Sequence, residues 1–579
     1  MSFTITCEPA ATSSSSNREI SAVRRSAESP TQRSTLGGSC GMPFRFLGQD
    51  SSFLKLALLF AFVLIGVAAG ASVVAAQSVQ LSVDVSKPGA TISRNLFGQF
   101  AEHLGHGVYG GIWVGPDSTI PNTRGIRTDV VAALKLLKVP DVRWPGGCFA
   151  DEYHWRDGIG RQRVVTLNPN WGGVIEPNTF GTHEFQDFLD QIGSQAYVSI
   201  NVGSGTPREA EEWLEYMTAA QPTTLVQERA ANGHPQPYQV GFLGIGNESW
   251  GCGGNMTPDY YLSQLKIYSH FVRNFNPEQQ GNRHMLKIAV GPGGGGPQWD
   301  QWTETIMKAY QNGPLRDGID GLSMHSYTVG GHWPPSYASV GFGEREYAQI
   351  LKSTLNMNDL IDEHSALMDK YDPQKKVALV VDEWGAWYKP LPGTNPAFLV
   401  QQNSLRDAIL AALNLDIFAR HADRVRMANI AQMINVLQSM IMTDQDKMIL
   451  TPTYYVYKMY VPFHDAVFLP VTYDAGTYRH GDITLPRVDA IAAKDATGKL
   501  WLEITNIDAD RPVEIGIRLV GGEAKSTVGQ TLTAQKVDSV NTFDAPDAVV
   551  PKPVSARVEN GQLALKLPPK SVTVISVQR

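Results

Sequence analysis

Two glutamates, Glu248 and Glu383, each follow a short apolar run, in "GFLGIGNE" and "VALVVDEW" respectively. A lone glutamate in such a place is more often an ion-pairing or loop-capping residue than a reactive group. A pair has another use when both side chains reach one pocket. Glycoside hydrolysis needs one protonated carboxyl group to donate to the leaving oxygen and one ionised carboxylate to attack the anomeric carbon. The pair is therefore a candidate for that chemistry.

Asp382 competes with Glu383 for the role of attacking carboxylate, because the two are neighbours in the sequence. Side chains alternate between the two faces of a strand, which places these residues on opposite faces, and we expect Glu383 to face the pocket. Trp250, Trp384 and Trp387 follow the two motifs. Aromatic rings at a polar pocket bind sugars, but ordinary packing is an equally good interpretation for each tryptophan.

Eight apolar or β-branched runs alternate with amphipathic helical segments between residues 96 and 455, and each run ends in polar or glycine-rich residues. This pattern predicts an α/β fold with a (β/α)8 TIM barrel, with a doubly wound open sheet as the alternative. Chemistry in such a barrel occurs at the carboxyl ends of the strands, where Glu248 ends the fourth run and Glu383 the seventh. The predicted strands are Leu96–His103, Asp141–Gly147, Ala196–Gly205, Gln239–Glu248, Lys287–Gly293, Gly321–Tyr327, Val377–Trp384 and Met427–Met433.

The pattern changes towards the C-terminus, where residues 456–579 alternate between apolar and polar residues with turn signals between the runs. This predicts an antiparallel all-β sandwich, jelly-roll-like, as an additional domain. Residues 77–95 precede the barrel and include the strand-like "SVQLSVDV", which we expect to join the same sandwich. A chain of 579 residues suits a barrel of residues 96–455 together with one smaller domain.

Residues 1–76 are predicted to be an N-terminal extension and a signal peptide. Residues 53–77 contain a basic residue, Lys55, then an apolar stretch and small residues up to Ala76. This order is typical of a secretory signal, and a membrane anchor is the alternative. Met42 is an alternative start to Met1. The interpretation predicts an exported protein, periplasmic or extracellular, with no membrane attachment once the signal is cleaved.

The composition excludes several classes of protein. The formal net charge of −7 provides no basic surface, so nucleic acid is not an expected partner. Zinc-type Cys/His spacing and a P-loop are both missing from the sequence, so no metal or organic cofactor is expected. The run "GPGGGGPQ", residues 291–298, lacks the P-loop lysine and indicates a loop between a strand and a helix.

Several longer motifs make a more specific resemblance. The segments "LFGQFAEHLGHGVYGGIWVG", "VRWPGGCFADEYHWRDGIG", "GFLGIGNESWGCGGNM", "SMHSYT", "VVDEWGAWY" and "ANIAQMINVLQSMI" occur in order along the predicted barrel. Together they resemble glycoside hydrolase family fifty-one, the α-L-arabinofuranosidases, among the clan A retaining glycosidases. The resemblance extends from about Ser78 to the C-terminus. It implies a (β/α)8 barrel with a β-sandwich made from both ends of the chain.

The resemblance also implies a role for individual residues. Glu248 would be the general acid/base and Glu383 the nucleophile. Asn247 would bind the sugar 2-hydroxyl, and Tyr327 would donate a hydrogen bond to the nucleophile. The remaining residues implied to line the sugar site are Glu102, His325 and Gln432, with Trp250 beside the acid/base and Asn435 as a weaker candidate.

Cys148 departs from the family pattern, because many members have asparagine after "PGG". A thiol is a weak hydrogen-bonding substitute for an amide, so a sugar contact at this position is in doubt. Cys252 comes four residues after Glu248, and both cysteines follow predicted strand ends. A disulfide between Cys148 and Cys252 and two separate buried residues are equally good interpretations, and export would permit the bond.

These observations predict a retaining enzyme that releases terminal non-reducing α-L-arabinofuranosyl residues from arabinose-containing plant polysaccharides or oligosaccharides by double displacement. An endo-glucanase or xylosidase on the same machinery is the alternative, because loops determine the substrate of a barrel enzyme. A non-catalytic sugar-binding protein is disfavoured, because both carboxylates are present. Members of the family often form oligomers, so a homo-oligomer is an expectation whose subunit number the sequence does not specify.

Overall fold

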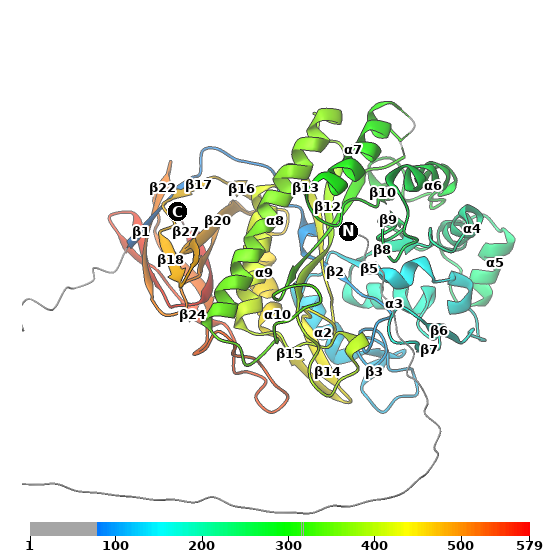
Figure 1. Cartoon of the computed structure of the whole chain (residues 1–579), viewed down its shortest axis with the longest axis horizontal. Coiled ribbons are helices and arrows are strands. Elements are labelled where there is room, and N and C mark those ends of the chain that lie inside the picture. The colour runs from blue at the N-terminus through cyan, green and yellow to red at the C-terminus, as the bar shows by residue number, and fades with distance from the viewer. Residues whose placement is uncertain (1–77, 314, 317, 579) are drawn as a thin grey trace, which may run out of the picture. The chain divides into compact units, whose positions relative to one another are not determined.

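The structure, a computed structural model, describes residues 78–313, 315–316 and 318–578. Within these residues, parallel strands close into an eight-stranded barrel, since the last strand pairs with the first (Figure 1). The predicted (β/α)8 barrel is confirmed, and the open sheet is excluded. The barrel strands are β2 (Gly98–Phe100), β5 (Asp141–Trp144), β8 (Gln195–Ile200), β9 (Phe242–Ile245), β10 (Leu286–Ala289), β11 (Gly321–Val329), β12 (Ala378–Trp387) and β13 (Val425–Ile430).

Several strands end earlier than the apolar pattern predicted. The predicted strand Leu96–His103 is reduced to Gly98–Phe100. The Leu104 amide donates to the Glu102 carbonyl, so the chain turns immediately after the strand. The residues beyond the last ladder hydrogen bond are thus released from the sheet, and their side chains can turn towards the barrel mouth.

Helices surround the barrel and begin at the expected caps. The Thr206 hydroxyl accepts a hydrogen bond from the Glu209 amide, and the Thr257 hydroxyl accepts one from the Tyr260 amide, with proline at the next position in both cases. The helices are α2 (Thr128–Leu137), α3 (Thr182–Ile192), α4 (Pro207–Thr218), α5 (Thr224–Ala231), α6 (Pro258–Phe271), α7 (Pro297–Gln311), α8 (Glu344–Tyr371), α9 (Leu405–Arg420) and α10 (Pro452–Tyr460).

Helix α10 corrects the predicted end of the barrel. It contacts both α9 and α2, so it occupies the place of the helix that follows the last barrel strand. The predicted boundary after residue 455 falls inside this helix. The tyrosine-rich sequence of α10 is buried on nearly every side, and so it lacks the one-sided apolar pattern that marks a surface helix.

The all-β domain is a sandwich of two sheets, ordered β17-β1-β22-β26-β25 and β16-β20-β21-β27-β23-β24. Its strands are β1 (Ser78–Asp84), β16 (Val467–Leu469), β17 (Val471–Tyr473), β20 (Val488–Lys494), β21 (Leu500–Asn506), β22 (Val513–Val520), β23 (Ser526–Leu532), β24 (Lys552–Val554), β25 (Arg557–Glu559), β26 (Gln562–Leu567) and β27 (Ser571–Gln578). Strand β1 joins this domain as expected. The prediction of purely antiparallel pairing is wrong for β1 and β22, which are parallel because β1 enters from the other end of the chain.

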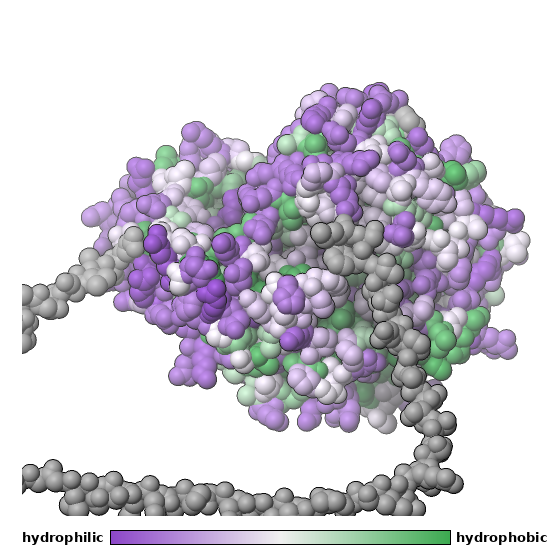
Figure 2. Space-filling model, in the orientation of Figure 1, coloured by the Kyte–Doolittle hydropathy of each residue, from purple (hydrophilic) through white to green (hydrophobic). Residues whose placement is uncertain are grey.

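The N-terminal extension, the predicted signal peptide and its alternative as a membrane anchor all lie outside the described residues. Among the helices of the described part, each is too short or too polar to cross a lipid bilayer. Figure 2 shows hydrophobic residues gathered over the hairpin of β6 (Thr166–Asn168) and β7 (Val174–Glu176), where Leu167 and Ile175 are exposed.

A buried pair of carboxyl groups joins the barrel to the sandwich. Asp416 on α9 and Glu503 on β21 are both fully buried and lie close enough for each carboxyl group to affect the pKa of the other. The Tyr460 hydroxyl donates to Asp416 over 2.8 Å, and the Thr505 hydroxyl donates to Glu503 over 2.6 Å. Burial, followed by the neighbouring Asp416 carboxylate, raises the pKa of Glu503 well above its ordinary value. The pair therefore holds a proton that separated, solvated carboxyl groups would release.

This pair predicts a pH-dependent stability. The unfolded chain releases the Glu503 proton near its ordinary pKa of about 4.3, whereas the folded chain keeps it. Stability is therefore lost as the pH rises above that value, at up to about 1.4 kcal/mol per pH unit. The Glu503→Gln variant donates from an amide without needing that proton, so its thermal midpoint falls less between pH 5 and pH 8.

The matched control is Glu514→Gln on β22, since Glu514 is partly exposed and pairs with Lys566 at the surface. Its midpoint is expected to follow the wild type across the same pH range. Parallel curves for wild type and Glu503→Gln would show that the buried pair holds no extra proton.

Candidate active site

Glu248 and Glu383 meet at the carboxyl ends of the barrel strands. Glu383 lies within β12, and Glu248 lies three residues beyond the end of β9. One carboxylate oxygen of each glutamate and a ring nitrogen of His325 lie within 4.8 Å of one another. Glu248 has a φ of 33°, in the left-handed region that side chains rarely adopt, and such backbone strain is concentrated at functional sites. The barrel thus brings together two carboxylates that the sequence separates.

A β-bulge places both Asp382 and Glu383 on the inside of the barrel. The register between β11 and β12 shifts after Ser323 and Val380, and the register between β12 and β13 shifts in the same region. A bulge adds one residue to a strand and interrupts the alternation of its side chains. The prediction that these two residues occupy opposite faces is therefore wrong, because strict alternation does not hold across the bulge.

Arg143, on β5, connects the two glutamate motifs. Its Nη1 donates to Glu383 Oε1 over 2.7 Å, and its Nη2 donates to Asn247 Oδ1. The guanidinium carbon lies 4.6 Å from the centre of the Phe100 ring, and the side chain is 1% exposed. Sequence reasoning missed this residue. The arginine within the predicted buried strand "VRWPGG" could have indicated it, because a buried guanidinium requires acidic or carbonyl partners nearby.

Glu102 accepts hydrogen bonds from the other side of the pocket. Its Oε1 accepts from the Gly147 and Phe149 amides and from the Trp171 indole, and its Oε2 accepts from the Gln432 amide over 3.0 Å. Burial, followed by the nearby Glu383 carboxylate, raises the pKa of Glu102 to about 7. Glu102 therefore holds together three segments that border the site.

These groups surround one small pocket at the barrel mouth. Six of the predicted site residues line it, whereas His325 lies against the glutamates at its base. Trp171, from the β6–β7 hairpin, was missed because it comes from a loop that no barrel pattern reveals. The lining residues are Glu102, Leu104, Gly147, Cys148, Trp171, Asn247, Glu248, Tyr327, Glu383, Trp387, Leu399, Gln432 and Leu437.

Two predicted ligands and one flanking tryptophan point elsewhere. The Trp250 indole donates to the Gly291 carbonyl, and its ring packs against Trp299. The Asn435 amide donates to the His106 carbonyl and to a threonine of the following hairpin. Trp384 is fully buried, with its ring against Phe418. These residues support the walls of the barrel and are not among those that line the pocket.

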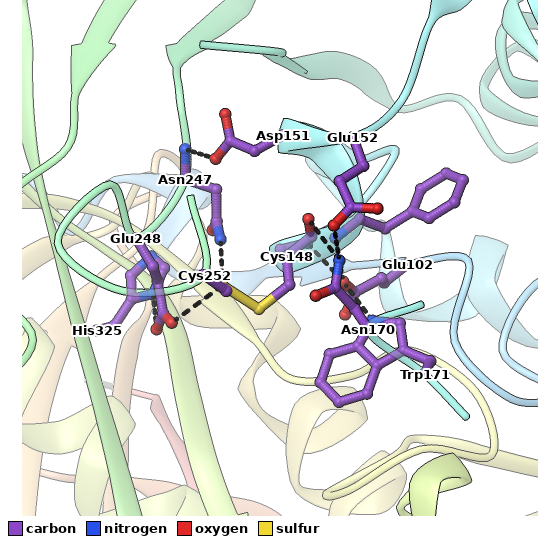
Figure 3. The surroundings of a disulfide bond; sticks show 12 residues. Glu102, Cys148, Asp151, Glu152, Asn170, Trp171, Asn247, Glu248, Cys252 and His325 are labelled. Carbon is purple, nitrogen blue, oxygen red and sulfur yellow. Dashed lines mark hydrogen bonds and ion pairs between the residues drawn. A yellow bond between two sulfur atoms is a disulfide. The ribbon is translucent and has the colours of Figure 1, made fainter. Parts of the chain in front are cut away.

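The Cys148 and Cys252 sulfur atoms are bonded to each other (Figure 3). This disulfide joins the 3-10 helix Cys148–Asp151 to the loop that follows Glu248. Cys252 Sγ lies 3.7 Å from Glu248 Oε2, and the Asn247 amide group reaches the same sulfur at 3.8 Å. Asp151 supports the loop from the same 3-10 helix, because its Oδ2 accepts from the Asn247 backbone amide over 3.0 Å. One covalent link, the disulfide, and one hydrogen bond, from Asn247 to Asp151, therefore hold the segment that carries Glu248.

Comparisons with known proteins agree on one family. The Alpha-L-arabinofuranosidase 1 domain matches residues 133–312, and the Alpha-L-arabinofuranosidase C-terminal domain matches residues 382–571. A relative from Bacteroides ovatus, described as an intracellular exo-alpha-L-arabinofuranosidase, is 44% identical over 517 residues. That match covers 88% of this chain and 98% of the relative. The chain belongs to the α-L-arabinofuranosidase family, glycoside hydrolase family 51.

Solved structures of family 51 members share the architecture. The GH51 arabinofuranosidase from Xanthomonas axonopodis pv. citri is 51% identical, with a TM-score of 0.83, and the match covers 86% of this chain and 100% of that chain. The α-L-arabinofuranosidase from Thermotoga maritima, solved as an arabinose complex, is 31% identical, with a TM-score of 0.73. That match covers 87% of this chain and 100% of the Thermotoga chain.

The prediction that the chain is exported to the periplasm or outside the cell is wrong. The Bacteroides ovatus family member, 44% identical, is described as intracellular. The prediction rested on residues 53–77, which lie outside the described residues. An apolar stretch with small residues at its end is a feature of composition, and composition alone does not determine where a chain is delivered.

The disulfide predicts a measurable contribution to stability. It closes a loop whose ends are 104 residues apart, and a link of that length restricts the unfolded chain. The Cys148→Ser/Cys252→Ser double variant is expected to lose roughly 3–5 kcal/mol of unfolding free energy. Urea unfolding followed by tryptophan fluorescence measures the change. Dithiothreitol should lower the urea midpoint of the wild type and leave the midpoint of the double variant unchanged. Equal midpoints for both proteins, with and without dithiothreitol, would contradict the expectation.

Proposed function

We propose that the protein is a retaining α-L-arabinofuranosidase in which Glu383 is the nucleophile and Glu248 the general acid/base. The observation that carries this proposal is the spacing of the two carboxylates. One oxygen of Glu248 and one oxygen of Glu383 lie within 4.8 Å of each other. Retaining glycosidases place their carboxyl groups about 5–5.5 Å apart, whereas inverting enzymes leave about 6.5–9.5 Å for a water molecule. The spacing supports direct attack by a carboxylate.

The contacts of Glu383 suit a nucleophile. Its Oε1 accepts from Arg143 and its Oε2 accepts from the Tyr327 hydroxyl over 2.8 Å. Two donors stabilise the ionised form and fix the direction of the carboxylate. In the first step a Glu383 oxygen bonds to the anomeric carbon, and the bond from that carbon to the leaving oxygen breaks. Glu248 gives its proton to the leaving oxygen, which departs as a hydroxyl group.

The second step reverses these roles. Water attacks the anomeric carbon of the glycosyl-enzyme, Glu248 takes a proton from the water, and the bond to Glu383 breaks. Two inversions at the anomeric carbon give a product with the original configuration. Glu248 is then protonated and Glu383 ionised, as they were before the reaction.

The walls of the pocket support the release of single terminal sugars. Trp171 and Trp387 present aromatic surfaces, while Leu399 and Leu437 add apolar surface to the lining. Glu102, Asn247 and Gln432 provide polar groups at hydroxyl positions, as the family resemblance implies. A small pocket of this kind suits one terminal sugar unit, whereas an endo-acting enzyme requires an open cleft. The exo-acting Bacteroides ovatus relative supports the same mode of action.

Azide rescue tests the nucleophile. Glu383→Ala is expected to lose nitrophenyl α-L-arabinofuranoside hydrolysis by on the order of 10⁵-fold, because the attacking group is removed. Azide enters the vacated space and restores release of nitrophenol, giving the glycosyl azide of inverted configuration. Glu248→Ala is the matched control, since azide there attacks the glycosyl-enzyme and gives the retained product. Full activity in Glu383→Ala, or a retained azide from it, would reject the assignment.

A substrate panel tests the sugar and the mode of action. We expect kcat/KM on nitrophenyl α-L-arabinofuranoside to exceed that on the xyloside and the glucoside by on the order of 100-fold. With an arabinose-containing oligosaccharide, arabinose is expected as the first product from the earliest time points. Shorter oligosaccharides appearing before free arabinose would favour endo action, and a preference for the glucoside or xyloside would favour the alternative enzymes.

A further inference from the structure

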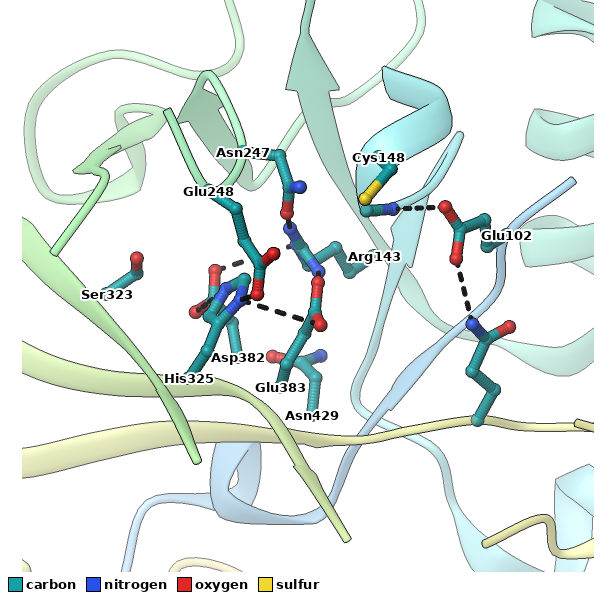
Figure 4. Close-up of polar contacts among 12 residues, drawn as sticks. Glu102, Arg143, Cys148, Asn247, Glu248, Ser323, His325, Asp382, Glu383 and Asn429 are labelled. Carbon is teal, nitrogen blue, oxygen red and sulfur yellow. Dashed lines mark hydrogen bonds and ion pairs between the residues drawn. The ribbon is translucent and has the colours of Figure 1, made fainter. Parts of the chain in front are cut away.

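Asp382 is a buried carboxylate that the double displacement leaves without a role. It lies at the β12 bulge, and its exposed fraction is 2%. Its Oδ2 accepts from the Tyr197 hydroxyl over 2.7 Å and lies 3.5 Å from Arg143 Nε. Its Oδ1 lies 3.3 Å from His325 Nε2. These contacts hold Asp382 at the base of the site, behind the two catalytic glutamates (Figure 4).

Asp382 thus contacts two basic groups, and each of them binds a different catalytic carboxylate. Arg143 donates to Glu383 over 2.7 Å. His325 Nδ1 lies 2.8 Å from Glu248 Oε1. One buried anion therefore connects the supports of both reacting groups.

The two ring nitrogens of His325 both face carboxyl groups. Nε2 faces the Asp382 carboxylate and Nδ1 faces the Glu248 carboxyl group. A neutral imidazole carries only one N–H, so only the imidazolium donates in both directions. Nδ1 also lies 3.5 Å from Glu383 Oε2, so a single N–H is shared between the nucleophile and the acid/base.

The reaction moves a negative charge between the two carboxylates that share this N–H. Glu383 is charged before glycosylation, while Glu248 still carries its proton. Afterwards Glu383 is bonded to the sugar, and Glu248 is charged because it has given its proton away. A cation fixed between them can stabilise each charged state in turn without reorganising.

We propose that Asp382 is a positioning residue that keeps His325 protonated, so that the imidazolium is the counter-charge for whichever catalytic carboxylate is ionised. This inference rests on the proposed function, because it requires the charge to move from Glu383 to Glu248. Asp382 itself takes no part in bond formation.

The charges around His325 support this state. Glu248 faces it from the loop after β9, Asp382 and Glu383 face it from β12, and Arg143 adds an opposing positive charge from β5 behind Asp382. Burial alone lowers the pKa of His325, but the Glu383, Asp382 and Glu248 carboxylates outweigh it and raise that pKa to about 10. Tyr197 and Tyr327 complete the titratable groups at this position, each donating to a β12 carboxylate.

Asp382 remains ionised in the same surroundings. Burial alone raises the pKa of Asp382, but Arg143 and His325 outweigh it and lower that pKa below its ordinary value. A side chain held by Tyr197, Arg143 and His325 is also unable to reach the pocket that holds the sugar. The bulge therefore separates an attacking carboxylate from a supporting one.

The Asp382→Asn variant tests the inference, because it removes the charge and keeps the shape. Loss of the anion makes the His325–Glu248 pair release its first proton more readily. The alkaline limb of kcat/KM against pH, measured with nitrophenyl α-L-arabinofuranoside, should move to lower pH by about one unit or more. We expect kcat at pH 8 to fall on the order of 100-fold, with a smaller change in KM.

Two control variants separate charge from packing. Tyr197→Phe removes one hydrogen bond to Asp382 and leaves its charge, so the alkaline limb should stay in place. Asp141→Asn makes the same isosteric exchange at another buried carboxyl group of the barrel, whose Oδ1 accepts from the Asn429 amide. Its alkaline limb should also be unchanged. An unshifted limb in Asp382→Asn, or an equal shift in Asp141→Asn, would overturn the proposal.

The His325→Gln variant tests whether Asp382 acts through the histidine. It should lose kcat on the order of 100-fold, and adding Asp382→Asn to it should not move the alkaline limb further. Wild-type kcat in His325→Gln would overturn the proposal even if Asp382→Asn failed to fold. Hydrolysis by the wild type and azide rescue of Glu383→Ala report on the proposed function separately, so the two ideas can fail independently.

Discussion

A guanidinium in the interior of the barrel constrains the whole site. Arg143 is charged at any physiological pH and is almost completely buried, so its charge must be matched by nearby acceptors. Glu383 and the Asn247 side-chain oxygen accept hydrogen bonds from Arg143, and Asp382 lies beside it as a second anion. The arginine therefore determines where Glu383 lies and orients Asn247, the residue beside Glu248. Loss of one acceptor would leave a buried charge partly unpaired.

Much of the architecture can be predicted from the sequence, because burial of one face of a helix or strand imposes a periodic pattern of apolar residues. Eight apolar runs, two strand-end glutamates and a strand-like segment before the barrel all correspond to features of the structure. These features depend on local periodicity, which a single sequence contains. The helix α10 boundary was misplaced because that helix is buried on nearly all sides and has no polar face to mark it.

The remaining features depend on three-dimensional contacts that periodicity does not encode. The bulge at Asp382 lies in a run that is apolar on both faces, so the extra residue leaves no interruption in the pattern. Trp171 reaches the pocket from a hairpin outside the barrel strands. Trp250 is of a residue type that often binds sugars, but its indole N–H donates to the Gly291 carbonyl. Residue type alone did not reveal which way these rings point.

The position of β1 has a consequence for the order in which the protein is made. Leu81 pairs with Tyr473 on one side and with Ile517 on the other, so both partner strands leave the ribosome after the entire barrel. Strand β1 therefore waits without a partner through most of translation. An unpaired strand is a template for aggregation. Its alternation of polar and apolar residues, "SVQLSVD", keeps one face hydrophilic during that interval. Among the described residues, the first strand to be synthesised is thus among the last to be paired.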